Sequence, residues 1–247
     1  MGNIFSEIDQ LQLEINACKP FQKEILDQLK EYYKIGLTYT SNALEGNSLT
    51  ESETKIVVEE GLTIGGKPLR DHLEAVGHAE AFDFLYRIAK NRSISEEEIK
   101  KLHQLFYMHI DPTKAGCYRT IPVFVTGSKY PLPAPKELSH LMGECVLRME
   151  RMRKEKHPAE AAALIHKEFV FIHPFIDGNG RVARLLMNLF LLQEGFNIVI
   201  IPPAVRSEYI ENLEKAHTDD RLFVQFIARM VKECQKDYLR LIANFSG

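Results

Sequence analysis

The sequence predicts one mainly helical domain that carries a small β-hairpin on its surface. Apolar residues recur at helical spacing along most of the 247 residues. Two helix-start signatures are present, and only one short segment is rich in residues that favour strands. Hydrophobic residues make up 45% of the chain, so a chain of this length can bury a sizeable core.

The helix signals give the order of the expected elements. Two capping boxes mark helix starts, because a hydroxyl side chain is followed three positions later by glutamate. They are Thr50 with Glu53 and Ser95 with Glu98. From these signals and the apolar periodicity, helices are expected over residues 4–15, 25–33, 40–45, 51–60, 69–89, 96–110, 136–154, 159–172, 180–194, 206–217 and 221–245.

The strand signal lies between the helices expected at 96–110 and 136–154. Val123, Phe124 and Val125 form an apolar run, residues 126–129 have turn composition, and residues 130–133 contain two prolines. Since proline cannot donate to a strand ladder, the second arm is expected at an exposed edge. The pattern predicts a surface hairpin.

The chain divides into an N-terminal helical extension, residues 1–37, and a main domain, residues 38–247. The main domain contains the short helix near 40–46 and a glycine-rich loop at 173–184, and the whole is expected to form one compact unit. The apolar stripe at 4–15 has two interpretations, a core contact or a contact in a homodimer.

Composition and charge limit the partners and the compartment. The net charge is −3, and no basic stripe predicts a nucleic-acid partner. No segment approaches the roughly 18 apolar residues that a bilayer-spanning helix needs, so no membrane partner is expected. The four cysteines form no close pair and no signal peptide is recognisable, which predicts a cytoplasmic protein with reduced thiols.

The strongest functional signal is the segment Asp177-Gly178-Asn179-Gly180, which is followed directly by an apolar helical pattern. Glycine and asparagine tolerate positive φ, so their backbone N–H groups can converge on an anion. A helix start favours an anion as well, because its first N–H groups are unpaired and its dipole is positive there.

Charged side chains extend this anion site. Arg181 and Arg184 are three residues apart, so they lie on one helix face with a rise of about 4.5 Å, similar to the spacing of phosphates in a polyphosphate. Arginine suits bidentate phosphate contacts. Asp177 can hold a magnesium ion that bridges the phosphates, and His173, at the end of the preceding helix, is a candidate general base. The pattern predicts attack of a hydroxyl on a bound di- or triphosphate.

The loop also resembles a known signature. His-Pro-Phe-x-x-Gly-Asn-Gly-Arg-x-x-Arg, with Asp before the first glycine, is similar to the signature of Fic-domain AMP transferases. The matching residues are His173, Pro174, Phe175, Asp177, Gly178, Asn179, Gly180, Arg181 and Arg184. Segments 116–119, 123–135 and 206–209 resemble the family's G-x-Y-R segment, its target-receiving flap and its adenosine-end segment, and the resemblance covers about residues 38–238.

The resemblance implies a mainly helical Fic fold and transfer of AMP from ATP, the co-substrate, with Mg²⁺, onto a Ser, Thr or Tyr hydroxyl of a protein target. It implies His173 as the base and Asp177 as the metal ligand. The ATP-binding residues that it implies are Gly178, Asn179, Gly180, Arg181, Arg184, Tyr209 and His217, and the docking residues of the flap are Val123, Phe124 and Val125. Because the kinase-like Doc branch has lysine in place of Gly180, the resemblance implies AMP transfer rather than phosphorylation.

A second motif lies far upstream. Ser41 to Gly46 resembles the family's inhibitory motif S/T-x-x-x-E-G/N, which implies that Glu45 pairs with Arg184 and blocks productive placement of the γ-phosphate. The alternative is a plain helix end with a solvated Glu45, closed by Gly46 in the left-handed conformation. Together with the downstream signature, the motif favours autoinhibition.

Two other functions fit the same residues. One is a hydrolase that removes AMP from a modified protein, with Glu45 positioning a water. The other is a binding module that senses nucleotide without turnover, although His173 argues against it. The target protein is not predicted by the sequence.

Overall fold

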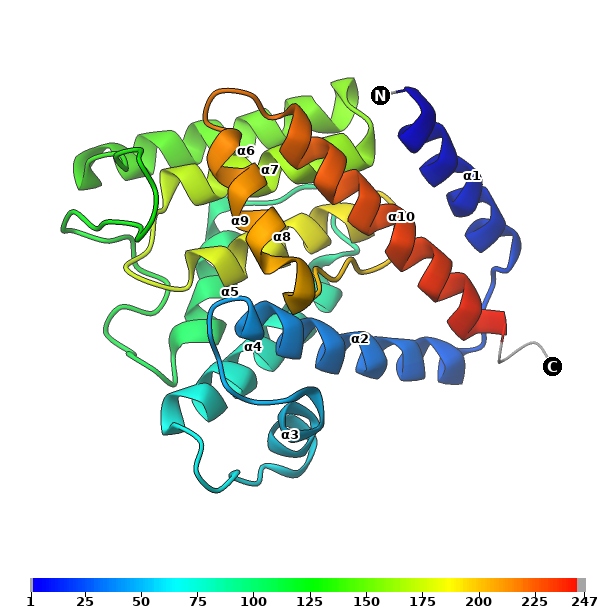
Figure 1. The fold of residues 1–247 in the computed structure, drawn as a ribbon, viewed down its shortest axis with the longest axis horizontal. Helices are drawn as coiled ribbons and strands as arrows, with labels where there is room; N and C mark the ends of the chain where they lie inside the picture. The colour runs from blue at the N-terminus through cyan, green and yellow to red at the C-terminus, as the bar shows by residue number, and fades with distance from the viewer. Residues whose placement is uncertain (1, 244–247) are drawn as a thin grey trace.

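The computed structural model describes residues 2–243, with side chains from Ile4 onward, and all regular structure in these residues is helical (Figure 1). The helices are α1 (Gly2–Ala17), α2 (Lys23–Ala43), α3 (Glu51–Lys55), α4 (Leu69–Ile88), α5 (Glu96–Tyr107), α6 (Leu138–Glu155), α7 (Pro158–Ile172), α8 (Asn179–Gln193), α9 (Arg206–Lys215) and α10 (Arg221–Ala243). Short turns of π-helix, η1 (Ile56–Glu60), and of 3₁₀-helix, η2 (Pro135–Glu137) and η3 (Pro203–Val205), complete the list. The mainly helical fold class is therefore confirmed; residues 244 and 245 of the last predicted helix lie outside the described residues.

Both predicted capping boxes are present. Thr50 and Ser95 each accept a hydrogen bond from the backbone N–H three residues later, and the glutamate at that position reaches back to the first backbone N–H. These reciprocal bonds satisfy helix-start donors that would otherwise lack partners. Gly61 closes the π-helical turn in the left-handed conformation, at φ 67°.

The separate short helix expected at 40–45 is wrong, because residues 40–43 form the last turn of α2 and residues 44 and 45 follow it in a turn. Gly36 does not interrupt the helix, and a Cβ there would lie 3.0 Å from Ile200 Cδ1, so this glycine serves close packing. α2 therefore runs without a break through residues 37 and 38, where the sequence suggested that the N-terminal extension ends. Gly46 does adopt positive φ, at 95°, just beyond the helix.

The predicted β-hairpin is also wrong. Residues 119–134, here called the flap loop, contain no strand and run as an irregular segment between α5 and α6. Within it, Ser128 N donates to Val125 O over 3.1 Å and closes a turn, but the two prolines of the second arm cannot continue a ladder. The base of the loop is held instead by Arg119, which donates to Ile121 O and Pro133 O.

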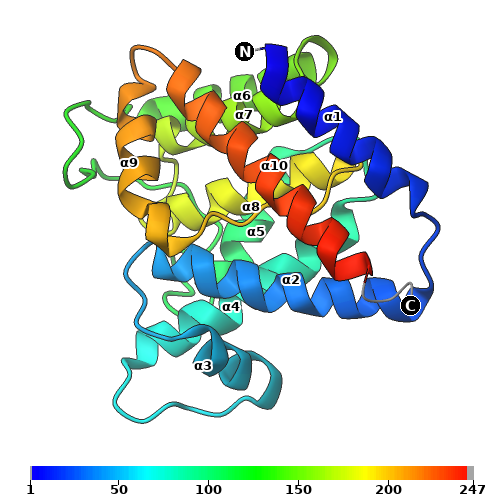
Figure 2. The same ribbon diagram turned by 45° about the vertical axis from the view of Figure 1, so that its right-hand side comes forward.

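Helix α8 lies at the centre of the core. α2, α4, α5 and α7 pack on it, and nearly all of its residues are buried (Figure 1). α10 crosses the outside of this layer, packs on α7 and α9, and lies alongside α1 (Figure 2). Ile8 and Ile15 are buried in that contact, so the N-terminal apolar stripe is a core contact. The homodimer stays a prediction.

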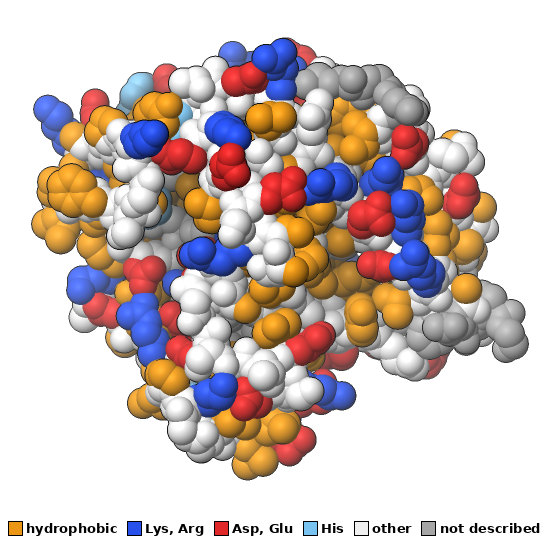
Figure 3. Space-filling model, in the orientation of Figure 1, with side chains coloured by type: hydrophobic (Ala, Val, Ile, Leu, Met, Phe, Trp, Pro, Cys, Tyr) orange, Lys and Arg blue, Asp and Glu red, His pale blue; other side chains and the backbone are white. Residues whose placement is uncertain are grey.

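The surface is mixed in charge. Figure 3 shows Lys, Arg, Asp and Glu side chains interspersed with apolar groups over the visible face. Within residues 2–243, no helix combines the length and the apolar character that a bilayer crossing needs. The most exposed large apolar side chain that the structure describes is Phe124 of the flap loop, with 96% of its area accessible.

The contact between α4 and α5 depends on Gly77. A Cβ at this position would lie 2.3 Å from Phe106 O, a distance that requires the two helices to separate. We expect Gly77→Ala to lower the free energy of unfolding by about 1–3 kcal/mol, because overpacking strains the backbone. Urea denaturation measures the change.

Gly143 in α6 is the matched control, because a Cβ there meets no atom within 4 Å. Gly143→Ala should raise the free energy of unfolding by about 0.5–1 kcal/mol through helix propensity alone. Equal gains in stability for the two variants would contradict the close contact at Gly77.

Candidate active site

His173 ends α7 in the left-handed conformation, at φ 51°, and is the one non-glycine residue with positive φ that the structure describes. Its Nδ1 lies 3.2 Å from Val170 O. A carbonyl can only accept, so Nδ1 holds the proton and Nε2 keeps its lone pair. Burial lowers the pKa of His173, with a smaller contribution from Arg119, and the ring is therefore neutral at pH 7.

Arg119 fixes the backbone carbonyl groups of this histidine and of the next residue. Its Nε donates to His173 O over 2.8 Å, and its backbone N donates to Pro174 O over 2.9 Å. Its Nη2 reaches Pro133 O at 2.7 Å. One buried guanidinium thus joins the glycine-rich loop to the base of the flap loop.

The interior of the loop is closed by its own side chains. Asn179 Oδ1 accepts from Phe175 N at 3.0 Å, and Asn179 Nδ2 donates to Phe175 O at 2.9 Å. The Phe175 ring stacks face to face on His103 at 3.7 Å. The oxygen and the nitrogen of the Asn179 side-chain amide therefore both hold the loop backbone at Phe175.

His103 supports the same loop from α5. Gly116 N donates to its Nδ1 over 2.9 Å, so Nε2 holds the proton and donates to Asp177 O over 3.2 Å. Burial lowers the pKa of His103 to about 4, which keeps the ring neutral. The role of His103 is to position the Asp177 backbone.

The two glycines of the loop allow close contact with two different side chains, because neither glycine has a Cβ. At Gly178, with φ 76°, a Cβ would lie 2.7 Å from the Phe106 ring. At Gly180, a Cβ would lie 2.2 Å from Glu45 Oε1. α8 begins at Asn179, and the first N–H groups of a helix have no partner within it. Glu45 therefore stands directly against the start of α8.

Arg184 is 2% exposed and is surrounded by oxygen atoms. Its Nε donates to Ser41 Oγ at 2.9 Å, and its Nη2 donates to Ser41 O at 2.8 Å and to Glu45 Oε1 at 2.7 Å. The predicted contact between Glu45 and Arg184 is present. Desolvation alone would raise the pKa of Glu45, but the charges of Arg184 and Arg181 outweigh it and lower that pKa, so Glu45 is ionised.

Tyr209 and Arg206 brace this pair from α9. Arg184 Nη1 donates to Tyr209 OH at 3.2 Å, which leaves the Tyr209 proton to bond His166 Nε2 at 2.9 Å. Burial lowers the pKa of His166 to about 3. Arg206 Nε donates to Leu44 O at 2.6 Å and holds the end of α2 in place. Tyr209 thus links the Arg184 guanidinium to the buried ring of His166.

Arg181 and Asp177 belong to a second charged group. Arg181 Nη2 lies 3.3 Å from Asp177 Oδ1, and Arg181 Nη1 lies 3.3 Å from Glu74 Oε1. Asp177 Oδ1 also accepts from Gly178 N at 2.6 Å, and Asp177 Oδ2 contacts Arg70 Nη2. Desolvation alone would raise the pKa of Asp177. The opposing effects of Arg181, the Gly178 N–H and Arg70 are larger together and lower that pKa, so the carboxylate is charged.

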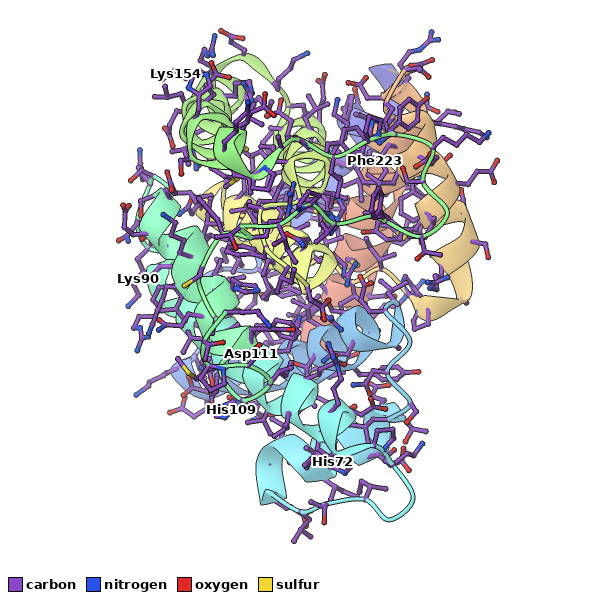
Figure 4. The ribbon with its side chains drawn as sticks, turned by 90° about the vertical axis from the view of Figure 1, so that its left-hand side faces the viewer. His72, Lys90, His109, Asp111, Lys154 and Phe223 are labelled. Carbon is purple, nitrogen blue, oxygen red and sulfur yellow. The ribbon has the colours of Figure 1, made fainter. Side chains whose placement is uncertain are left out.

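His217 fastens the tip of the flap loop. Its ring lies 3.8 Å from Tyr130 and 3.6 Å from Phe171, nearly parallel to both. Lys129 N donates to Glu214 Oε1 over 2.8 Å beside this stack. Figure 4 shows the loop leaving Asp111 and crossing towards the orange helix α9. Both faces of His217, which the resemblance implies as an ATP-binding residue, are therefore covered.

Comparison with known proteins agrees with this geometry. The model of the Fic/DOC family matches residues 93–191. A solved fragment of Fic-1 from Caenorhabditis elegans has a TM-score of 0.88 and 30% identity, and the match covers 98% of this chain and 72% of that one. The chain belongs to the Fic/DOC family. A Fic domain containing signaling protein from Bacteroides thetaiotaomicron has a TM-score of 0.87 and 27% identity, with 96% and 97% coverage.

The Fic relatives known by sequence are longer than this chain. Protein adenylyltransferase Fic of Nematostella vectensis is 40% identical over 205 residues, which are 81% of this chain and 48% of the relative. Protein adenylyltransferase fic-1 of Caenorhabditis briggsae is 34% identical over 214 residues, 85% of this chain and 42% of the relative. The chain thus spans less than half the length of these relatives.

In this Fic chain the predicted site residues fall into two regions. The first region surrounds the start of α8 and comprises His173, Asp177, Gly178, Asn179, Gly180, Arg181, Arg184, Tyr209, Ser41 and Glu45. Val123, Phe124, Val125 and His217 belong to the flap loop or its anchor. Sequence reasoning missed Arg70, Glu74, His103 and His166 as site residues. Their only signal was an ionisable residue inside an amphipathic helix, and such residues are normally solvated.

The buried neutral histidines make Fic stability depend on pH. The unfolded chain binds a proton at His103 near its ordinary pKa of 6.5, whereas the folded chain does not until about pH 4. Folding stability from this group is therefore fully present above pH 6.5 and is lost as the pH falls towards 4. Between about pH 7.5 and about pH 5.5 the loss is about 1 kcal/mol for His103.

His103→Gln should remove that part of the pH dependence, measured by urea denaturation at both pH values. The control is His140→Gln, because 76% of the His140 side chain is accessible. An unchanged slope of stability against pH in His103→Gln would show that His103 is already charged in the folded state.

Proposed function

We propose that this chain transfers AMP from ATP to a Ser, Thr or Tyr hydroxyl of a protein target, and that Glu45 inhibits the transfer. The observation that carries the proposal is the neutral His173, whose Nε2 is free to accept a proton beside the anion-binding start of α8. The names of the relatives, protein adenylyltransferase Fic, support it.

The roles of the chain's own residues follow from this geometry. His173 Nε2 accepts the proton of the attacking hydroxyl, while the Nδ1–H bond to Val170 O keeps the required tautomer. The hydroxyl oxygen forms a bond to the α-phosphorus, the bond from that phosphorus to the bridging oxygen breaks, and pyrophosphate leaves. The start of α8 with Arg181 and Arg184 holds the negative charge of the phosphates.

The residues around Asp177 fit a magnesium ion that arrives with the nucleotide. No group of three or more potential metal ligands exists among residues 2–243, so the protein offers one carboxylate and not a complete cage. Mg²⁺ is commonly held by one or two carboxylates together with substrate phosphates. Asp177 would hold the ion, which would neutralise phosphate charge, and Gly178 N keeps Asp177 in its orientation.

The proposed inhibition has a simple physical basis. Glu45 places a carboxylate against Gly180 and Arg184, where a phosphate oxygen would bind. The carboxylate and a phosphate compete for the same guanidinium, because both are anions. Glycine at position 180 is needed for this contact, since a Cβ would collide with Glu45 Oε1.

Glu45→Gly should raise the initial rate of AMP transfer by about tenfold or more, which corresponds to about 1.4 kcal/mol of barrier. The reason is that Arg184 then becomes available to the phosphates. The measurement follows label from α-³²P-ATP with Mg²⁺ into protein for the parent chain and for Glu45→Gly.

Glu45→Gly combined with His173→Ala is the control for catalysis. It should lose about 10²–10⁴-fold in rate, because the proton acceptor is absent. Equal rates for the parent chain and Glu45→Gly would argue against inhibition. Nucleotide binding without label in either chain would favour the sensor, and Glu45-dependent loss of AMP from a modified protein without ATP would favour the hydrolase.

The flap loop is the proposed docking segment for the target. Arg119 ties its base to the His173 backbone, so a target bound at Val123, Phe124 and Val125 is held at a fixed distance from the base. The Phe124 ring is almost fully exposed and offers an apolar anchor. Since the loop is not a strand, pairing with a target strand would require it to become extended.

Phe124→Ala in the Glu45→Gly background should lower the rate of transfer to a protein target by about threefold or more and leave self-modification unchanged. Because the ring is exposed, the free energy of unfolding should change by less than about 0.5 kcal/mol. Leu147→Ala, which removes an exposed leucine from α6, is the matched control. Equal losses in both reactions would rule out a docking role for Phe124.

A further inference from the structure

Four side chains form a closed ring of alternating charge beside the glycine-rich loop. Arg70 Nε lies 3.0 Å from Glu74 Oε1, which lies 3.3 Å from Arg181 Nη1. Arg181 Nη2 lies 3.3 Å from Asp177 Oδ1, and Asp177 Oδ2 contacts Arg70 Nη2. Two members come from one turn of α4 and two from the loop and first turns of α8. Each carboxylate therefore has two cationic partners.

The members differ in their freedom to move. The side chains of Glu74 and Arg181 are 7% and 6% exposed, and Glu74 Oε2 also accepts from Asn47 Nδ2 at 3.1 Å. Arg70 is 52% exposed, and its bond to Glu74 spans a single helical turn. Arg70 can leave Asp177 for solvent while Glu74 keeps its bonds to Arg181 and Asn47. Arg70 is thus the exchangeable member of the ring.

We propose that Arg70 occupies the place of the divalent cation on Asp177 whenever no metal-bound nucleotide is present. Arg70 and the cation then compete for one carboxylate, because Asp177 Oδ2 faces the guanidinium and Oδ1 is already engaged by Gly178 N and Arg181. Arg70 is a positioning residue that holds Asp177 ionised and oriented, and it lowers the affinity for the metal. This inference rests on the proposed role of Asp177 as metal ligand.

The competition has a measurable consequence for nucleotide binding. Removal of Arg70 eliminates the competing cation, so the metal should improve nucleotide binding more than it does with Arg70 present. A general attraction between Arg70 and the phosphates acts with and without metal, so it cancels in the ratio of the two affinities. The ratio should rise by roughly two- to fivefold, the range that a solvent-exposed ion pair supports.

The test is calorimetric titration with α,β-methylene-ATP, once with Mg²⁺ and once with EDTA, so no transfer is needed. The chains all have Glu45→Gly and add Arg70→Ala, Asp177→Asn, or both. Arg87→Ala is the matched control, because it removes an exposed arginine from the far end of α4. We expect a larger Mg²⁺ effect in Arg70→Ala, an unchanged effect in Arg87→Ala, and none in Asp177→Asn with or without Arg70.

Two results would overturn the inference, and they differ in what else they remove. If Asp177→Asn abolishes the Mg²⁺ effect but Arg70→Ala leaves it unchanged or smaller, Arg70 does not compete with the metal, and the proposed function stands. If Asp177→Asn keeps the full Mg²⁺ effect, Asp177 is not the metal ligand, and that assignment fails together with the inference.

Discussion

Two guanidinium groups, those of Arg181 and Arg184, are buried at the start of α8, where the helix dipole is already positive. A charge buried without a partner costs several kcal/mol, so this arrangement requires negative charge from elsewhere in the fold. The requirement is met over long sequence separations, by Glu45 from the end of α2 and by Glu74 from α4. The packing of α2 and α4 on α8 brings these two carboxylates to the buried arginines.

The same requirement links the proposed inhibition by Glu45 to the proposed binding of phosphate. While an internal carboxylate neutralises the buried arginines, binding a phosphate adds little electrostatic stabilisation. Without that carboxylate the guanidinium charge is uncompensated, and a bound phosphate stabilises it strongly. Around Arg184, Ser41 and Tyr209 supply neutral oxygens that bond the guanidinium independently of Glu45. The guanidinium is therefore already oriented for an anion, which is the condition for electrostatic preorganisation.

The predictable part of the site was local in sequence. His173, Asp177 and the two arginines lie within twelve residues. Helix geometry places Arg181 and Arg184 on one face of α8, and the short loop before α8 keeps His173 and Asp177 close to its start. The unpredicted part depends on the tertiary fold, because His103 and Arg119 reach the loop from α5 and the flap loop. Capping boxes located helix starts well, since both halves of the signal lie within four residues.

The two wrong predictions, the separate helix at 40–45 and the β-hairpin, also failed because tertiary contacts decided the local structure. The sequence predicts separate helices at 25–33 and 40–45, whereas α2 is continuous and its Gly36 packs closely against Ile200. The apolar run 123–125 had strand composition, but a strand needs a hydrogen-bonding neighbour, and the proline-rich second arm cannot supply one. Instead, two side chains set the course of that loop. Arg119 bonds Pro133 O at the base, and His217, which is far away in the sequence, stacks on Tyr130 at the tip.

The two carboxylates that neutralise the arginines are not equivalent. Glu74 is 7% exposed and accepts from three segments of the chain, through Asn47, Arg70 and Arg181. Glu45 lies just beyond the last turn of α2, is 35% exposed, and has a single ion pair. Loss of Glu74 would remove an acceptor from three donors, including the buried Arg181, whereas movement of Glu45 into solvent would cost the one ion pair with Arg184. In the proposed inhibition, Arg184 is therefore the arginine that would exchange its carboxylate for a phosphate, while Arg181 would keep its ion pair with Glu74.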